Sequence, residues 1–376
     1  MVLLRLMRLS LALRRWQSDG FSLRDTLDAM TAPRTPMHLA ARLEDAVQSL
    51  RESWGRRRGL EPTIVPFTGY GGPGWVRVLG RVVLRRPELL TSVGDGSSDA
   101  FIGIRGWRSF TSVHVRDIEV QVVSGRSRRT IRADRGGVLD AHIKVSLTPG
   151  WHRIQLSIAG GGTVEAPVFI VDETLDFGLV SDIDATVMVT ALPRPFLAAW
   201  NTFVLDEHAR MPVAGMAVLY ERLTRAHPGL PVVYLSTGAW NVAPTLTRFL
   251  SRNLYPRGAL LLTDWGPTHD RWFRSGPEHK RVNLERLAAE FPRMRWLLVG
   301  DDGQHDERIY AAFAAAHPDR VAAIAIRQLT TGQAVLAGGR SDKEPHRSDT
   351  PWIYASDGAV LSARLTELGL LPAEPA

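Results

Sequence analysis

The sequence predicts an α/β fold with a doubly wound parallel sheet, preceded by a small β-sandwich and an N-terminal helical segment. From residue 175 onward, short apolar runs alternate with helical segments, which is the pattern of a doubly wound sheet. Between residues 60 and 172, short runs with a period of two are separated by glycine-rich turns, which is typical of a β-sandwich. With 376 residues, the chain is long enough for two domains.

These patterns divide the chain into five parts. We expect a helical segment at 1–58, a β-sandwich at 60–172, an α/β domain at 175–335, a polar mobile loop at 336–350, and a final helix and tail at 351–376.

Residues 1–16 alternate leucines with arginines, so as a helix they would be basic and amphipathic. Such a helix can lie on an anionic membrane surface, or it can pack on its own protein; an early start codon is a further explanation. Its longest uncharged run, 9–13, is too short for a signal-peptide core or a membrane span. We therefore expect a cytoplasmic protein, with peripheral membrane contact through residues 1–16 as an option.

Composition excludes several classes of site. The chain has no cysteine, which excludes disulfides, thiolate zinc sites and cysteine nucleophiles. The net charge of +7 raises nucleic acid as a partner. No zinc-finger spacing or recognition-helix pattern accompanies it, so we expect no nucleic-acid binding.

In the predicted β-sandwich, the glycine-rich segment 69–74 precedes a strand, whereas a phosphate-binding loop precedes a helix. We therefore interpret it as a turn. The expected strands are 75–84, 113–123, 130–133, 142–147 and 152–158.

The α/β region supplies five strands and four helices, with an insert at 190–210 expected to cover the pocket. The strands are 177–180, 232–235, 260–263, 296–299 and 321–326; the helices are 213–226, 242–253, 278–291 and 307–316. Residues 352–371 are expected to return as a final helix.

Asp182 and Asp184 lie two residues apart at the end of the first of these runs. Side chains at this spacing project the same way, so both carboxylates should enter one pocket at the carboxyl end of the sheet. Clustered carboxylates repel each other unless a cation or a proton lies between them. The hypothesis is a magnesium site with an aspartate nucleophile; the plainer alternative is an acidic turn or helix cap.

Further polar residues follow the later strands in order. Ser236 ends the second run, Lys280 lies on a helix, and Asp301, Asp302 and Asp306 follow the fourth run. Taken singly, they fit a turn serine, a solvated lysine and helix caps. Acidic clusters at the ends of two strands of one sheet favour a cation site instead.

The segments 181–187 (SDIDATV), 234–241 (YLSTGAWN) and 299–306 (VGDDGQHD) together resemble the haloacid dehalogenase superfamily, and within it the App1-type phosphatidate phosphatase catalytic domain. The likeness covers roughly residues 60–330. It implies that 175–335 is a phosphatase domain that hydrolyses a phosphate monoester.

The resemblance also implies roles for individual residues. Asp182 would be the nucleophile and Asp184 the acid–base, while Lys280 offsets charge. Thr186 and Ser236 would hold phosphoryl oxygens. The magnesium ligands would be Asp182, the backbone carbonyl of Asp184, and Asp301. Residues near the substrate or supporting the ligands would be Thr237, Trp240, Asn241, Asp302 and Asp306, the last two as supports or caps.

The chain departs from the family pattern at Ala185, at Gly238-Ala239 and at Asp302. These changes leave the reaction type as implied, whereas the substrate stays open: phosphatidate, a related lipid phosphate or another monoester. The alternatives are a non-catalytic module that binds a phospholipid headgroup or a partner, and phosphomutase chemistry on the same residues.

Overall fold

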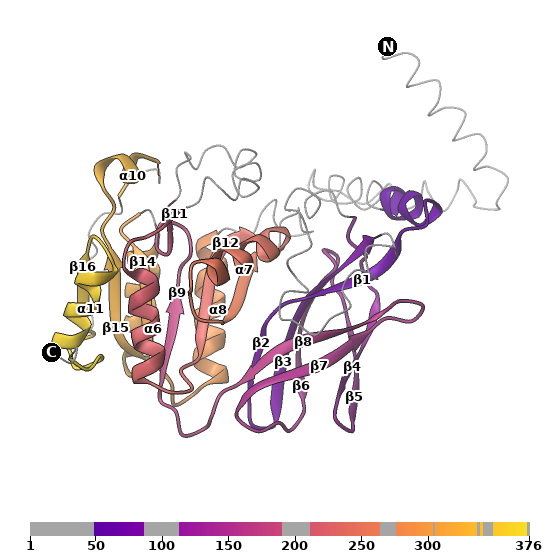
Figure 1. Cartoon of the computed structure of the whole chain (residues 1–376), viewed down its shortest axis with the longest axis horizontal. Helices are drawn as coiled ribbons and strands as arrows, with labels where there is room; N and C mark the ends of the chain where they lie inside the picture. Colours follow the sequence, from indigo (N-terminus) through magenta and orange to yellow (C-terminus); the bar gives the residue numbers. More distant parts are fainter. Residues whose placement is uncertain are drawn as a thin grey trace, which may run out of the picture. The chain divides into compact units, whose positions relative to one another are not determined.

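The computed structural model describes residues 49–85, 113–189, 211–263, 276–303, 305–336, 339–340 and 349–373 (Figure 1). All of these belong to one compact unit. The predictions for 1–16, for the insert at 190–210 and for most of the loop at 336–350 lie outside the described residues. Within those ranges, no helix has the length and apolar character needed to cross a membrane.

The first sheet is formed by eight strands, mostly antiparallel, in the order β1-β3-β2-β8-β7-β4-β5, with β6 paired to β3. Alternation along β3 gives it two buried faces: Val76 and Val78 enter the core of this sheet, while Leu79 and Val83 join the core of the parallel sheet. The strands are β1 (Glu61–Pro66), β2 (Gly69–Gly72), β3 (Trp75–Arg85), β4 (Glu119–Ser124), β5 (Ser127–Arg132), β6 (Val138–Lys144), β7 (Gly150–Ser157) and β8 (Thr163–Ile170).

The prediction of a turn at 69–74 is wrong for its first four residues, which form strand β2. Close backbone approach explains the glycines: a Cβ at Gly71 would lie 2.3 Å from the carbonyl oxygen of Trp75 on β3. Only the end of the segment turns, at Gly74, whose φ is +94°. A glycine run therefore marked a tightly packed strand rather than a loop.

The second sheet has six parallel strands in the order β13-β12-β9-β14-β15-β16; all but β13 are labelled in Figure 1. The α/β prediction is confirmed. The chain leaves β9 toward β12 on one side and leaves β14 toward β15 on the other, and β9 and β14 are neighbours. The strands are β9 (Phe177–Ser181), β12 (Val232–Ala239), β13 (Ala259–Thr263), β14 (Arg295–Asp301), β15 (Val321–Arg327) and β16 (Trp352–Ala355).

The sixth strand corrects the predicted final helix over 352–371. Ile353 and Ala355 are buried and alternate with partly exposed aromatic residues, which is the period of a strand. The helix α11 (Gly358–Glu367) begins only after Asp357, whose carboxylate accepts hydrogen bonds from the amides of Ala359 and Val360.

The helices of the α/β part connect successive strands. Helix α6 packs on α11, and α8 packs on α9 and β12. The helices are α6 (Met216–Ala226), α7 (Ala243–Arg252), α8 (Gly276–Glu290), α9 (Asp306–Ala316) and α10 (Thr331–Leu336), with short 3₁₀ turns η4 (Trp240–Val242) and η5 (Pro318–Arg320) and a small ladder of β10 (Met188–Val189) with β11 (Met211–Pro212).

Helix α8 also contacts the eight-stranded sheet through its last residue, Glu290. Tyr70 Oη and Arg77 Nη1 each donate a hydrogen bond of 2.7 Å to this carboxylate. Nearby, Asp140 accepts from Arg77 Nε at 2.5 Å and from Arg286 at 3.2 Å. These mostly shielded pairs fix the far end of α8 against β2, β3 and β6.

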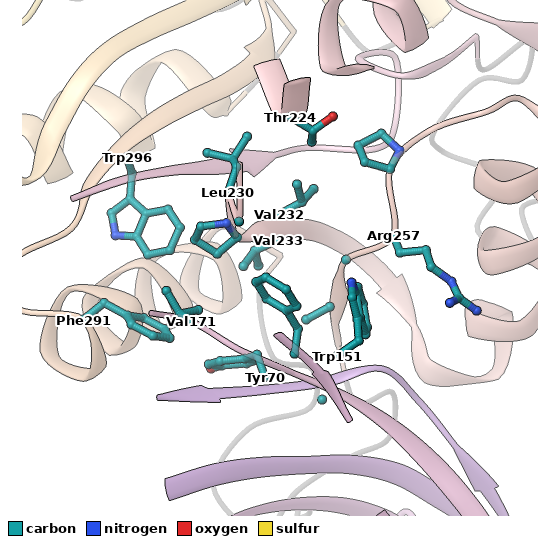
Figure 2. Close-up of a pocket in the computed structure, with 17 residues that line it drawn as sticks. Tyr70, Trp151, Val171, Thr224, Leu230, Val232, Val233, Arg257, Phe291 and Trp296 are labelled. Carbon is teal, nitrogen blue, oxygen red and sulfur yellow. The ribbon is translucent and has the colours of Figure 1, made fainter. Parts of the chain in front are cut away.

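A cavity of about 390 Å³ lies at the amino-terminal ends of the parallel strands (Figure 2). Val232 and Val233, the first residues of β12, line it, so it is at the opposite end from the predicted site. Arg257 is the only charged residue among those that line it. The aromatic lining residues are Tyr70, Trp151, Phe169, Phe291 and Trp296.

Candidate active site

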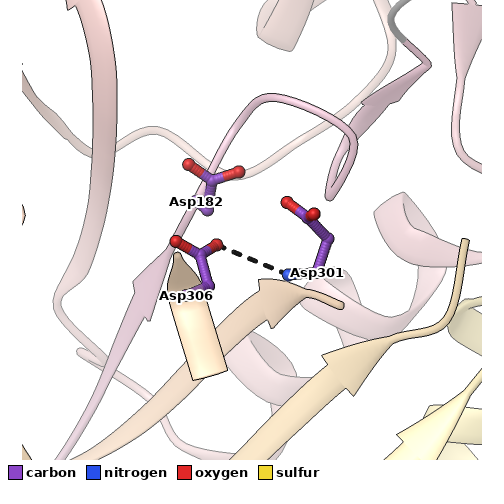
Figure 3. Close-up of side chains that lie close together, drawn as sticks. All are labelled: Asp182, Asp301 and Asp306. Atoms are coloured by element: carbon purple, nitrogen blue, oxygen red, sulfur yellow. Dashed lines mark hydrogen bonds between the residues drawn. The ribbon is translucent and has the colours of Figure 1, made fainter. Parts of the chain in front are cut away.

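Three carboxylates meet where β9, β14 and α9 come together (Figure 3). Asp182 directly follows β9, Asp301 ends β14, and Asp306 begins α9. One oxygen atom from each lies within 4.8 Å of the others, and all three side chains are buried. The parallel pairing of β9 with β14 produces this geometry, and the amide of Asp182 continues it by donating to the carbonyl of Val299 at 2.8 Å.

Lys280 pairs with two of these three carboxylates. From α8, its Nζ donates to Asp182 Oδ1 at 2.6 Å and to Asp306 Oδ1 at 2.5 Å, and the side chain is 6% exposed. Burial alone would lower the pKa of Lys280, but the carboxylates of Asp182 and Asp306 outweigh it and raise that pKa. The ammonium therefore stays charged, and the reading as a solvated surface lysine is wrong.

Asp182 holds the most deeply buried charge of the group. Burial raises the pKa of its carboxyl well above the usual range; Lys280 opposes this rise, and the neighbouring aspartates add to it. Its Oδ2 atom accepts no hydrogen bond from any described residue. A buried carboxylate oxygen left in this way is a position for a cation or for an incoming electrophile.

Asp184 faces Ser236 across the carboxyl end of the sheet. Ser236 Oγ donates to Asp184 Oδ2 at 3.0 Å and accepts from the amide of Gly238 at 2.9 Å. Ser236 lies within strand β12 and is buried, so it is not a turn residue. The hydroxyl of Thr186 is also buried and has no hydrogen-bond partner among the described residues.

A tight turn follows Asp182. The amides of Val187 and Met188 donate to the carbonyl of Ile183, and the amide of Ala185 donates to that of Met188. Ala185 has a φ of +63°, in the left-handed region that residues with a Cβ seldom adopt. This turn sets the direction in which Asp184 leaves the strand.

Asp302 and Asp306 differ in what they contact. Asp302 accepts from the amide of Leu329 at 2.8 Å and pairs with Arg340 at 3.1 Å, so it anchors the segment after β15. We expected Asp306 to support a ligand or to cap a helix. The N-cap of α9 is His305, and the Asp306 carboxylate instead shares Lys280 with Asp182 and accepts from the amide of Asp301.

The residues expected near the substrate take separate positions. Thr237 is exposed, and its carbonyl accepts from the hydroxyl of Thr263. Trp240 is buried and stacks on Phe67, which follows β1, with ring centroids 5.0 Å apart. Asn241 has a buried Oδ1 with no hydrogen-bond partner in the described ranges. Trp240 therefore packs against Phe67, and its place near the substrate stays a prediction.

Arg327 is the residue near the site that the sequence analysis missed. It ends β15 and is buried, and the predicted strand stopped one residue short of it. Its backbone pairs with Asp301 of β14. The available signal was a charged residue directly after the apolar run 321–326, beside a strand that ends in carboxylates.

Residues 177–328 match the family model described as phosphatidate phosphatase APP1, catalytic domain. The phosphatidate phosphatase APP1 of Saccharomyces cerevisiae is 22% identical over 151 residues, and an uncharacterized protein of Schizosaccharomyces pombe is 25% identical over 152 residues. Each alignment covers 40% of this chain and 25% of the relative, so the chain matches a quarter of the length of either protein. The resemblance to the App1-type catalytic domain is thereby confirmed for residues 177–328.

Among solved structures, a carbohydrate acetylesterase from Xanthomonas citri aligns over 82% of this chain and 74% of its own, with 11% identity and a TM-score of 0.30. A likeness at this level has no bearing on the fold or on the site.

Proposed function

We propose that this chain, whose residues 177–328 match the App1-type phosphatidate phosphatase catalytic domain, is a magnesium-dependent phosphatase of the haloacid dehalogenase type. It would hydrolyse a phosphate monoester through an aspartyl-phosphate. The observation that carries the proposal is the buried contact of Lys280 with Asp182 and Asp306, beside Asp301. The names of the family and of one relative support phosphatidate or a related lipid phosphate as the substrate.

Asp182 is the proposed nucleophile. Lys280 binds one of its carboxylate oxygens, which orients the group and leaves Oδ2 for in-line attack on phosphorus. The new bond joins Oδ2 to phosphorus, and the bond from phosphorus to the leaving-group oxygen breaks. The same lysine offsets negative charge on the phosphoryl group, and such charge offset is a large part of phosphoryl-transfer catalysis.

Asp184 is the proposed acid–base. It gives its proton to the leaving alkoxide and then takes a proton from the water that hydrolyses the aspartyl-phosphate. The hydrogen bond from Ser236 Oγ holds Asp184 Oδ2 on the side of β12. Ser236 and Thr186 are the proposed ligands of the phosphoryl oxygens, and the buried Thr186 hydroxyl, which has no partner among the described residues, supports that role.

The donor set fits magnesium. Asp182, Asp301 and Asp306 offer only carboxylate oxygens, the ligands that hard cations prefer. The ion would reduce repulsion between the anionic nucleophile and the anionic phosphate. We keep Asp182 and Asp301 as proposed ligands, with the Asp184 carbonyl, and add Asp306 as a candidate because its oxygen lies in the same cluster.

The test is phosphate release from phosphatidate in mixed micelles and from a soluble aryl phosphate, each with magnesium and with chelator. Asp182→Asn should reduce kcat/KM by at least about 10³-fold, because the nucleophile is lost. Asp319→Asn, an exposed aspartate in η5, is the matched control and should leave both rates unchanged.

The results of this test distinguish a lipid phosphatase, a phosphatase of other esters and a non-catalytic module. Release from phosphatidate that Asp182→Asn abolishes supports the full proposal, while release only from the aryl ester keeps the phosphatase and discards the lipid. Activity that survives Asp182→Asn contradicts the assignment of the nucleophile. Binding to anionic vesicles without turnover on any ester would favour the non-catalytic module.

A further inference from the structure

Arg327 is a buried cation that the proposed mechanism leaves without a role. The residue is only 5% exposed, yet no carboxylate in the described residues accepts a hydrogen bond from it. Its partners are neutral: the carbonyls of Ala185 and Ser356, and the side-chain oxygen of Gln333. Burial lowers the pKa of this guanidinium, and the nearby carboxylates of Asp301, Asp302 and Asp357 oppose that shift. The hydrogen bonds of Arg327 therefore go to backbone carbonyls and an amide side chain, although carboxylates lie nearby.

The shortest contact of Arg327 is to the turn that carries Asp184. Arg327 Nη1 donates to the carbonyl of Ala185 at 2.6 Å, and Ala185 is the residue directly after Asp184. Ala185 is also the turn residue with the disfavoured positive φ. The backbone at this point needs an external tether to hold one conformation.

The other side of the guanidinium reaches the segment after β15. Arg327 Nη2 donates to Gln333 Oε1 at 2.9 Å. Leu329 and Ala334 of the same segment pack against the methyl group of Ala185. One side chain therefore links the end of β15, helix α10 and the turn after Asp184.

We propose that Arg327 is a positioning residue that fixes the acid–base Asp184 through the carbonyl of Ala185. The inference rests on the proposed function, since it assigns Asp184 the proton transfer. The planar guanidinium group, with its several N–H donors, can bind Ala185, Gln333 and Ser356 at once, whereas a lysine ammonium in the same place cannot span them. Arg327→Lys therefore keeps the charge and removes the tether.

Leaving-group dependence tests this role. An alkyl phosphate needs a proton from Asp184 as the alkoxide leaves, whereas p-nitrophenolate leaves without one. The ratio kcat/KM reports the step that forms the aspartyl-phosphate. For Arg327→Lys we expect kcat/KM to fall about 30- to 300-fold on an alkyl phosphate and less than about threefold on p-nitrophenyl phosphate, within the range of acid–base catalysis.

Reference variants make the comparison specific. Asp184→Asn should show the same dependence on the leaving group as Arg327→Lys. Arg320→Lys, directly before the same strand β15, is the matched control and should leave kcat/KM unchanged on both substrates. Added guanidinium ion should restore part of the alkyl phosphatase activity of Arg327→Ala. Equal losses on both substrates, or an Asp184→Asn pattern unlike that of Arg327→Lys, would overturn the positioning role.

A second measurement does not depend on activity. Hydrogen exchange at the amides of Ala185 and Val187 should be at least tenfold faster in Arg327→Lys than in the unmodified chain, because the turn loses its tether. Unchanged exchange would overturn the inference. If the unmodified chain releases no phosphate, the proposed function fails, while faster exchange still supports the tether.

Discussion

The two ends of the parallel sheet differ in the polarity of their buried residues. At the carboxyl end, the buried carboxylates of Asp182, Asp301 and Asp306 cluster, and the buried Lys280 pairs with Asp182 and Asp306. At the amino end, a cavity is lined by aromatic and aliphatic side chains with one charged residue at Arg257. The same strands run through both ends, so the difference lies in the residues that begin and end them.

We assign the activity to the carboxyl end of the sheet and folding stability to the amino end. Desolvation of the buried charges offsets much of the attraction between Lys280 and its carboxylate partners, so the carboxyl end contributes little net stability although its charges are paired. Burying apolar area is favourable, at about 25 cal/mol per Å², so the amino end contributes stability. We therefore expect changes at the first end to affect activity most, and changes at the second to affect the free energy of unfolding alone.

The largest effect is expected for Lys280→Met. It leaves the buried carboxylates of Asp182 and Asp306 facing each other without their shared cation, which we expect to lower the free energy of unfolding by about 3–5 kcal/mol. Activity should fall below detection. Urea unfolding measures the first effect, and Lys144→Met, an exposed lysine on β6, is the control.

Magnesium should also affect the stability of Lys280→Met. A divalent cation among the three carboxylates should restore part of the stability of Lys280→Met, because binding to the folded state stabilises it. An unfolding midpoint that does not respond to magnesium would contradict the proposed ligand set.

Phe291→Ala is the corresponding change at the amino end. Phe291 lines the cavity and packs against the rings of Tyr70, Trp75 and Trp296. Its removal enlarges the cavity and should lower the free energy of unfolding by about 3 kcal/mol. We expect kcat/KM to change less than about twofold where the variant is folded. A loss of activity as large as that of Lys280→Met would contradict a purely stabilising role for the amino end.

Glu290→Gln tests the link between the ends, because α8 carries both Lys280 and Glu290. The change weakens the shielded bonds from Tyr70 and Arg77 and should lower the free energy of unfolding by about 1–2 kcal/mol. Glu278→Gln, at the partly exposed start of the same helix, should change it by less than about 1 kcal/mol. Equal effects in thermal unfolding would show that the contact with the eight-stranded sheet contributes nothing.

The last prediction concerns pH and the eight-stranded sheet, and its effect disappears at neutral pH. Burial lowers the pKa of His114 to about 4, whereas in the unfolded chain it is about 6.5. Between these values the unfolded state binds the extra proton, so the free energy of unfolding falls as pH drops through this window. His114→Gln should flatten this part of the pH profile measured by urea unfolding. An unaltered slope would assign the effect to other groups.

Much of the α/β region could be predicted because its apolar runs end in polar residues, as at Asp182 and Asp301. The burial of Lys280 could not, since only the packing of α8 beside β12 places the lysine between carboxylates. Strand β2 was missed because glycines that allow close backbone approach have the same composition as a turn. Arg327 was missed because its partners come from segments far apart in the sequence.

The stretch that matches the family model is shorter than the unit that folds around it. A fragment that consists of residues 177–328 alone would lack β16 and α11 at one edge of the sheet. It would also lack Phe67, on which Trp240 stacks. It would also free the last turn of α8 from Tyr70 and Arg77. The matched boundaries are therefore a poor guide to dissection of this protein: a fragment cut there would retain every proposed catalytic side chain and lose the surfaces that hold them in place.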